Sequence, residues 1–322
     1  PGFAIRQEAD ERGLGEASGY VLLNGQRISN KSDDILAQLR RIPAANVVRI
    51  EIRDGATLGI PGLSGQVANI ISRAGGLTGR WSYRPEFRAR FTDPLLTRFE
   101  TSVSGEHGPV QYTFGLENQA SHSGAGGDTL IFDPAGAVIE ERFDVWTGEF
   151  NQPRASARFV FDGPGDAVGN LNAAVRDFRY RFAEDGTRVA PALPDRERDV
   201  RDREDGWDYE VGGDYEFAFG PGRLKLIGLD RFSTSTYESA VTVDYADSRP
   251  RTGDRILMDS EEAERIARAE YSLKRGDTDW QVSAEAAFNS LDSETRLFAL
   301  QPSGAETEIA FPCGVARAKG DR

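Results

Sequence analysis

The feature that most constrains this chain is an alternation of apolar and polar side chains that recurs along most of its length. The segment 207–219, WDYEVGGDYEFAF, has aromatic residues, valine and glycine at odd positions and acidic or small residues at even positions. Successive side chains of a β-strand point to opposite faces, so such a strand has one apolar and one polar face. The alternation therefore predicts an antiparallel sheet whose two faces meet different surroundings.

About nine segments after residue 78 repeat this pattern, and we expect each to be a strand. They are 81–91, 99–103, 112–116, 155–161, 174–182, 207–219, 224–232, 267–273 and 280–288. Tight turns are expected at 106–110, 162–170, 220–223 and 275–279, and long polar loops at 121–152, 183–206 and 234–263. Short turns at one end of a sheet and long loops at the other are typical of β-barrels of the bacterial outer membrane.

The free energies of transfer indicate which face would meet lipid. A Lys or Arg at the lipid-facing midplane costs about 2–4 kcal/mol, whereas each apolar side chain removed from water contributes about 1.5–3 kcal/mol. We therefore expect the apolar positions to face lipid and the polar positions to face an aqueous interior. Aromatic residues at strand ends fit the interface girdles of such barrels; they are Trp81, Trp207, Phe219, Trp280 and Phe288.

One residue interrupts the apolar face. Arg176 falls among the apolar positions of the segment 174–182, and we expect it at the lower interface, where a charge costs about 0–1 kcal/mol. Alternation alone also fits a soluble, secreted β-sandwich that binds a ligand and packs its apolar face on a second sheet. The loop asymmetry and the aromatic strand ends favour the membrane interpretation.

Composition argues against several function classes. The formal net charge of −13 disfavours nucleic acid as a partner, because binding phosphates needs clustered basic residues. The single cysteine, Cys313, and the two histidines, His107 and His122, are too few for a metal centre of the usual kinds. Paired carboxylates such as Asp33 and Asp34 lack a nucleophilic or basic partner at motif spacing. We therefore expect no enzyme, no metal and no cofactor.

Residues 1–78 have a different character. The segment 31–43, KSDDILAQLRRIP, has apolar residues at helical spacing and ends in a proline, which predicts a short amphipathic helix. It lies between a strand with an Asn-Gly turn at 19–28 and an alternating strand at 47–55. We expect a small α+β domain over 1–78 and the strand-rich domain over 79–322.

The first domain carries several motifs in a fixed order. YVLLNGQRIS, DDILAQLRRIPAANVVRIEIRDGA and GQVANIISR follow one another, and PGFAIR precedes them. This succession, over about residues 1–75, resembles the plug domain of TonB-dependent outer-membrane receptors. Two positions depart from that pattern, with Gln7 where a glycine is usual and Val48 where a glutamate is usual.

The resemblance implies a membrane β fold, an antiparallel transmembrane β-barrel of 22 strands around a plug. With about nine strands visible, we expect a fragment that lacks the front of the plug and more than half of the barrel. Unpaired strand edges are costly in lipid, so these strands are expected to form an open part of a larger barrel. The implied location is the outer membrane of a Gram-negative bacterium.

The resemblance also implies a function without bond-making chemistry. That function is TonB-energised active uptake of a scarce solute such as a siderophore, cobalamin or an oligosaccharide. The implied partners are the inner-membrane TonB complex, outer-membrane lipid and the solute, which is a small molecule or an oligosaccharide. A signalling receptor of the same family, with an extra N-terminal domain, is a further alternative.

Two groups of candidate site residues lie in the first domain. Arg49, Glu51 and Arg53 lie on one face of their strand, and we expect ion pairs between them and charges on the interior of the barrel. The loop after the first plug strand resembles an apical loop that contacts substrate, and its candidate residues are Arg27, Ser29, Asn30 and Lys31.

Overall fold

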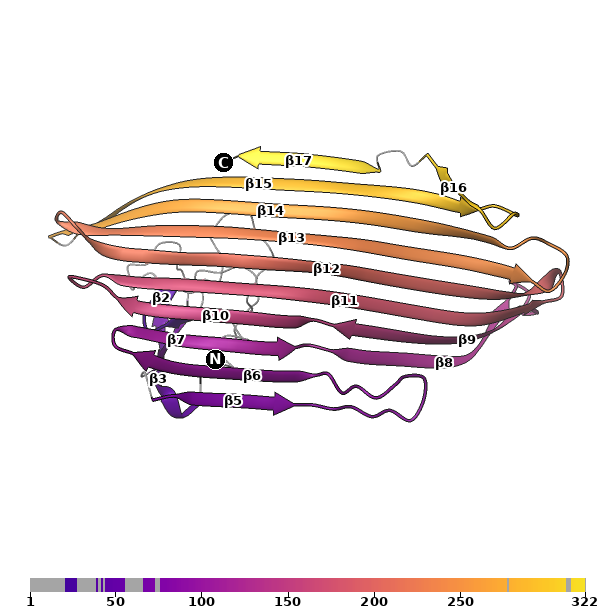
Figure 1. Ribbon diagram of the computed structural model, residues 1–322, viewed down its shortest axis with the longest axis horizontal. Coiled ribbons are helices and arrows are strands. Elements are labelled where there is room, and N and C mark those ends of the chain that lie inside the picture. Colours follow the sequence, from indigo (N-terminus) through magenta and orange to yellow (C-terminus); the bar gives the residue numbers. More distant parts are fainter. Residues whose placement is uncertain are drawn as a thin grey trace.

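The computed structural model describes residues 21–27, 39, 42, 44–55, 66–72, 76–276, 278–310 and 314–321. Within these ranges almost every residue lies in a β-strand, together with a short 3-10 helix, η1 (Ala44–Asn46). The strands form one sheet of four strands and one of 13 (Figure 1). None of the described helical residues belongs to a helix of the length and apolar character needed to cross a bilayer.

The four-stranded sheet comes from the first domain. Its order is β2 (Gln26–Arg27), β1 (Val21–Leu23), β4 (Gln66–Ser72) and β3 (Val47–Asp54). β1 pairs with β4 in parallel, and the other pairs are antiparallel. The predicted Asn-Gly hairpin is confirmed, because Asn24 and Gly25 connect β1 to β2 with φ of 52° and 79°. Most of the expected helix at 31–43 lies outside the described residues.

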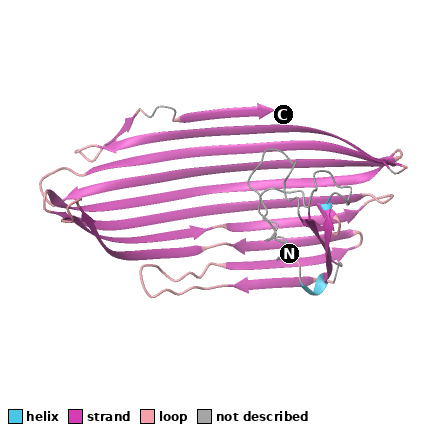
Figure 2. Cartoon of the chain, turned by 180° about the vertical axis from the view of Figure 1, so that it is seen from behind, coloured by secondary structure: helices cyan, strands magenta, loops and turns pink. Residues whose placement is uncertain are grey.

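The core of this small sheet consists of Val21, Leu23 and Ile70, against which Leu39, Ile42 and Val47 pack. Figure 2 shows the small sheet on one side of the large sheet, towards the end of the strands that carries the turns 163–167 and 220–221.

The large sheet is an antiparallel meander with the order β16-β15-β14-β13-β12-β11-β10-β7-β6-β5. Its strands are β5 (Thr78–Tyr83), β6 (Phe99–His107), β7 (Val110–Asn118), β8 (Ser121–Phe132), β9 (Val138–Asn151), β10 (Pro153–Asp162), β11 (Val168–Ala190), β12 (Leu193–Phe219), β13 (Gly222–Tyr245), β14 (Thr252–Arg275), β15 (Thr278–Leu300), β16 (Glu306–Ile309) and β17 (Val315–Asp321). β7 continues into β8, and β9 into β10, with one or two residues between them. β9 pairs with the second half of β11 and β10 with the first half.

All nine predicted segments contribute to strands, but the predicted long loops were wrong. Residues 121–151 form β8 and β9, whereas β11 and β12 meet at 191–192 and β13 and β14 at 246–251. The first supposed loop is therefore a pair of strands of 12 and 14 residues, and the other two are halves of strands that are 23 to 27 residues long. These polar segments form strands instead of loops because cross-strand pairs of opposite charge stabilise them where apolar pairs are lacking.

The large sheet is open in the part of the chain that the structure describes. β5 forms one edge, and β15 with its partners β16 and β17 forms the other. The prediction that the segment 81–91 is one strand was only half right, because β5 ends at Tyr83 and an isolated bridge joins Glu86 to Leu95. The expectation of an open, strand-rich sheet agrees with this arrangement.

Candidate functional site

The two faces of the large sheet differ in exposure as well as in polarity. Cross-strand partners share a face, so the register assigns every strand residue to one side. Trp207 and Phe219 of β12 are 44% and 57% exposed, whereas Glu210 and Asp214 of the same strand are 4% and 5% exposed. We call the side of Trp207 the outer face and the side of Glu210 the inner face.

An apolar band covers the outer face along the half of the strands that ends at the turns 163–167 and 220–221. Its large exposed side chains belong to seven strands: Trp81, Val103, Phe114, Leu116, Leu171, Val175, Trp207, Val211, Phe219, Leu226, Trp280, Val282 and Phe288. Single exposed apolar residues are normal on a soluble protein, but a contiguous patch across this many strands marks a contact surface.

Aromatic rings gather at both borders of the apolar band. Beside the turns, successive ring contacts with centroids 5.6 to 6.4 Å apart join Phe161, Tyr215, Phe217, Phe219 and Tyr271. At the opposite border, Trp207, Tyr209 and Phe232 lie with centroids 5.4 to 6.2 Å apart. The band thus has two aromatic margins, with smaller side chains such as Val211 and Gly213 between them on β12 and one exposed ion pair, Arg265 with Asp230 at 3.0 Å, in the row of Val211.

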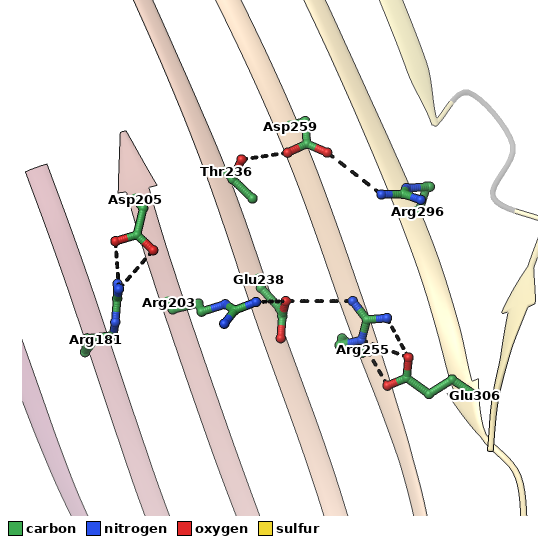
Figure 3. A network of polar contacts seen from close by, with 9 residues as sticks. All are labelled: Arg181, Arg203, Asp205, Thr236, Glu238, Arg255, Asp259, Arg296 and Glu306. Atoms are coloured by element: carbon green, nitrogen blue, oxygen red, sulfur yellow. Dashed lines mark hydrogen bonds and ion pairs between the residues drawn. The ribbon is translucent and has the colours of Figure 1, made fainter. Parts of the chain in front are cut away.

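Beyond Trp207 the same outer face becomes mainly charged (Figure 3), although exposed apolar side chains such as Phe143 and Val189 also lie there. The side chain of Arg181 pairs with Asp205 at 2.7 Å, and that of Arg203 pairs with Glu238 at 2.7 Å. Glu238 also lies 3.8 Å from Arg255, which in turn forms an ion pair with Glu306 at 2.5 Å. We call this network the charged belt.

The charged belt affects the protonation of its members. The Arg255 guanidinium, through its hydrogen bond, holds the pKa of Glu306 below the usual value. Farther along the face, burial raises the pKa of Asp199, and its cross-strand neighbour Asp185 raises it further.

The inner face is charged behind the apolar band. Lys225 lies 3.3 Å from Asp214, and Arg268 lies 2.7 Å from Glu270 and 3.3 Å from Glu285. These groups are largely buried and form ion pairs, as charges away from water require. The inner face also holds a small apolar cluster of Leu229, Ile266 and Ala287.

Arg176 belongs to this inner face, and the expectation that it interrupts the apolar face was wrong. Val175 pairs with Tyr209 on the outer face, while Arg176 pairs with Asp208 on the inner face. The side chains of Arg176 and Asp208 form an ion pair at 2.5 Å. The charge therefore has a carboxylate partner.

The reason is a change of phase within β11. Its apolar positions are odd from Leu171 to Val175 and even from Phe178 to Phe182, yet the pairing with β12 runs without irregularity from Val168 to Arg188. The apolar side chains therefore move from the outer to the inner face. The prediction of one alternating run over 174–182 was therefore wrong. The signal in the sequence is that the apolar residues move from odd positions, up to Val175, to even positions, from Phe178.

This phase change creates an inner aromatic patch on the half of the sheet that carries the charged belt outside. The patch consists of Trp146, Phe150, Phe178, Tyr180, Phe182 and Tyr237, all half-buried. Trp146 and Phe182 stack with ring centroids 5.9 Å apart. Burial raises the pKa of the Tyr180 hydroxyl, with the Asp202 carboxylate as the next cause.

The predicted plug residues Arg49, Glu51 and Arg53 lie together on β3. Glu51 accepts contacts from both arginines, at 2.6 Å from Arg49 and 2.8 Å from Arg53. The hydrogen bond from Arg49 is the main reason that the pKa of Glu51 lies below its usual value. Within the described residues these side chains pair with one another, and their predicted ion pairs with the large sheet stay a prediction.

The predicted loop residues are mostly outside the described residues. Arg27 ends β2, where its backbone pairs with Leu22, whereas Ser29, Asn30 and Lys31 are not described. The sequence reasoning missed two asparagines that hold the adjacent hairpin. Asn69 accepts a hydrogen bond from the Gly25 backbone N–H at 2.8 Å, and Asn24 accepts one from the Ser72 backbone N–H at 2.8 Å.

The described ranges contain no group of three or more His, Cys, Asp or Glu side chains arranged to hold a metal ion. Comparison of the chain with protein-family models, curated proteins and solved structures gave no match.

Proposed function

We propose that the large sheet is one side of a transmembrane β-barrel in the bacterial outer membrane, with its apolar band in contact with lipid. The single observation that carries this proposal is the change of the outer face from mainly apolar, with one exposed ion pair between Arg265 and Asp230, to mainly charged beyond the row of Trp207. A face that packed on a second protein layer would have no reason to become mainly charged at a border marked by aromatic rings. Water and lipid meet at such a border.

The dimensions agree with this assignment. A transmembrane β-strand needs about 9–11 residues when it is tilted by about 45°. The stretch from Tyr209 to Phe219, between the two aromatic margins, has this length. The rest of β12 carries charges on its outer face and projects beyond the bilayer.

The remaining parts support the uptake function that the motifs of the first domain imply. The small sheet acts as the plug, and the ion-paired inner face lines the barrel interior around it. Further strands pair with the edge at β5 and with the edge formed by β15, β16 and β17, because open edges in hydrocarbon leave backbone groups unpaired. The TonB complex displaces the plug, and a siderophore, cobalamin or an oligosaccharide passes inwards.

The test is to express the full-length gene product in a Gram-negative host and to fractionate the membranes. We expect it in the outer membrane, with a gel mobility in detergent that changes on heating. Solute uptake is expected to stop when the tonB gene is deleted. Recovery of the folded protein in the soluble fraction would contradict the proposal and favour a secreted β-sandwich.

A further inference from the structure

We propose that the inner aromatic patch is a binding surface for a neutral oligosaccharide. The inference deepens the proposed function and rests on it, because it names the class of solute that the uptake protein would take. Its starting point is the position of the patch. The rings lie on the inner face at the height of the charged belt, and thus beyond the part of the strands assigned to lipid.

The shape of the patch suits flat ligands. Phe150, Tyr180, Glu204 and Tyr237 are consecutive cross-strand partners on β9, β11, β12 and β13. Neighbouring strands are about 4.8 Å apart, so this row is about 14 Å wide, wider than one pyranose ring. Gly206 lies opposite Phe178, and a Cβ at Gly206 would come 2.5 Å from that ring. The ring therefore lies flat over the glycine.

The polar groups of the patch suit a ligand that carries hydroxyl groups. Carboxylates are acceptors and hydroxyls are both donors and acceptors, so together they suit vicinal hydroxyls of a sugar. Asp202 lies beside Phe182 and Tyr180, accepts a hydrogen bond from Ser239 at 2.6 Å, and keeps further acceptor capacity. Sugar C–H groups pack on ring faces, and a few placed polar groups fix the orientation of the ligand.

Charge argues against an anionic solute. Asp202 and Glu204 lie among the rings, whereas the arginines farther along the same face, Arg188 and Arg198, are already paired with Asp144 and Glu184. A carboxylated or phosphorylated ligand would meet like charges at short range, which costs free energy. A neutral, polyhydroxylated chain meets no such penalty and uses both the rings and the acceptors.

Binding can be tested with the full-length protein in detergent by isothermal titration with tetrasaccharides of glucan, xylan and chitin. We expect at least one to bind, and Phe182→Ala and Tyr237→Ala each to weaken the affinity about tenfold or more, as buried aromatic anchors do. The matched control is Phe219→Ala on the outer face, which should leave the affinity unchanged. No binding of any of the three, or tighter binding of a galacturonate tetramer, would overturn the inference.

A second experiment asks whether the patch is open. Tyr237→Cys in a Cys313→Ser background is treated with a hydrophilic maleimide, with and without the bound tetrasaccharide. We expect rapid labelling that the sugar suppresses. Lack of labelling without sugar would mean that the chain itself covers the patch, which overturns the inference. TonB-dependent uptake of an iron chelate with no sugar binding would refute the inference alone, whereas absence from the outer membrane would refute the proposed function.

Discussion

At the scale of single residues, the two sides of β11 give the same residue type different roles. Arg176 is partly buried on the inner face beside Asp208, whereas Arg179 on the outer face is exposed beside Asp177. Removal of one partner of a buried ion pair leaves an unpaired charge, but removal of an exposed partner has little effect. The surroundings, rather than the residue type, set the energetic consequence of a substitution.

We expect Arg176→Leu to lower the free energy of unfolding by about 1–3 kcal/mol, because Asp208 loses its partner away from bulk water. Arg179→Leu is the control and should change it by about 0.5 kcal/mol or less. Urea titrations of folding into detergent micelles would measure both. A stabilising effect of Arg176→Leu would mean that residue 176 faces lipid after all.

The pair Asp185 and Asp199 predicts a pH dependence. Because burial and Asp185 raise the pKa of Asp199 in the folded state, its charged form disfavours folding above that pKa, and the penalty disappears at lower pH. Asp199→Asn should therefore raise stability at neutral pH, and its advantage should vanish as the pH falls towards about 4, the ordinary aspartate pKa.

Glu306→Gln is the control, and its effect on stability at neutral pH should be opposite to that of Asp199→Asn. Arg255 lowers the pKa of Glu306, so the charged form stabilises the folded protein at neutral pH, and this contribution is lost as the pH falls through the lowered value. The variant should be less stable at neutral pH and equal to the parent protein in acid. Parallel pH profiles for both variants, obtained from urea titrations, would contradict the assignment of the two shifts.

At the scale of the strand, glycines opposite aromatic rings allow the rings to lie flat. A Cβ at Gly206 would come 2.5 Å from Phe178 and 2.6 Å from the Thr234 carbonyl oxygen, whereas one at Gly228 meets no atom within 4 Å. We expect Gly206→Ala to destabilise the protein by about 1–3 kcal/mol through overpacking. Gly228→Ala should be close to neutral, and equal effects of the two in urea titrations would contradict this explanation.

Much of the strand arrangement could be predicted from the sequence, because alternation and turn chemistry are local. Eight of the nine segments and the Asn24–Gly25 hairpin are found as expected, and the segment 81–91 only in part. The outer halves of the long strands were missed, since their regularity lies in cross-strand charge pairs such as Arg203 with Glu238, which only the register brings together. Polar composition alone resembles that of a loop.

The candidate sites were harder to predict for a related reason. The face of a residue depends on the phase of its strand, so the change between Val175 and Phe178 moved Arg176 and the aromatic rings to the inner side. The aromatic patch is built from β9, β11, β12 and β13, and no single segment shows it. By contrast, Arg49, Glu51 and Arg53 share one short strand, and their grouping follows from its period.

At the scale of the whole molecule, the apolar band predicts how the protein responds to charge. Leu171 lies on the outer face between the aromatic margins, so Leu171→Arg should disfavour folding into lipid vesicles by about 2–4 kcal/mol. Thr242→Arg, on the outer face opposite Asp199, is the control and should fold normally. Heat-modifiable gel mobility after refolding gives the folded fraction, and equal yields would contradict the band as a lipid contact.

The short connections at both ends of the long strands have a consequence for the proposed uptake of a solute. At about 3.3 Å per residue, a strand as long as β12 extends for about 90 Å. Under the proposed function, the part of the sheet beyond the bilayer is thus a stiff, hydrogen-bonded wall instead of a set of mobile loops. A solute that contacts it orders little of the polypeptide, so the entropic penalty of association falls mainly on the solute itself.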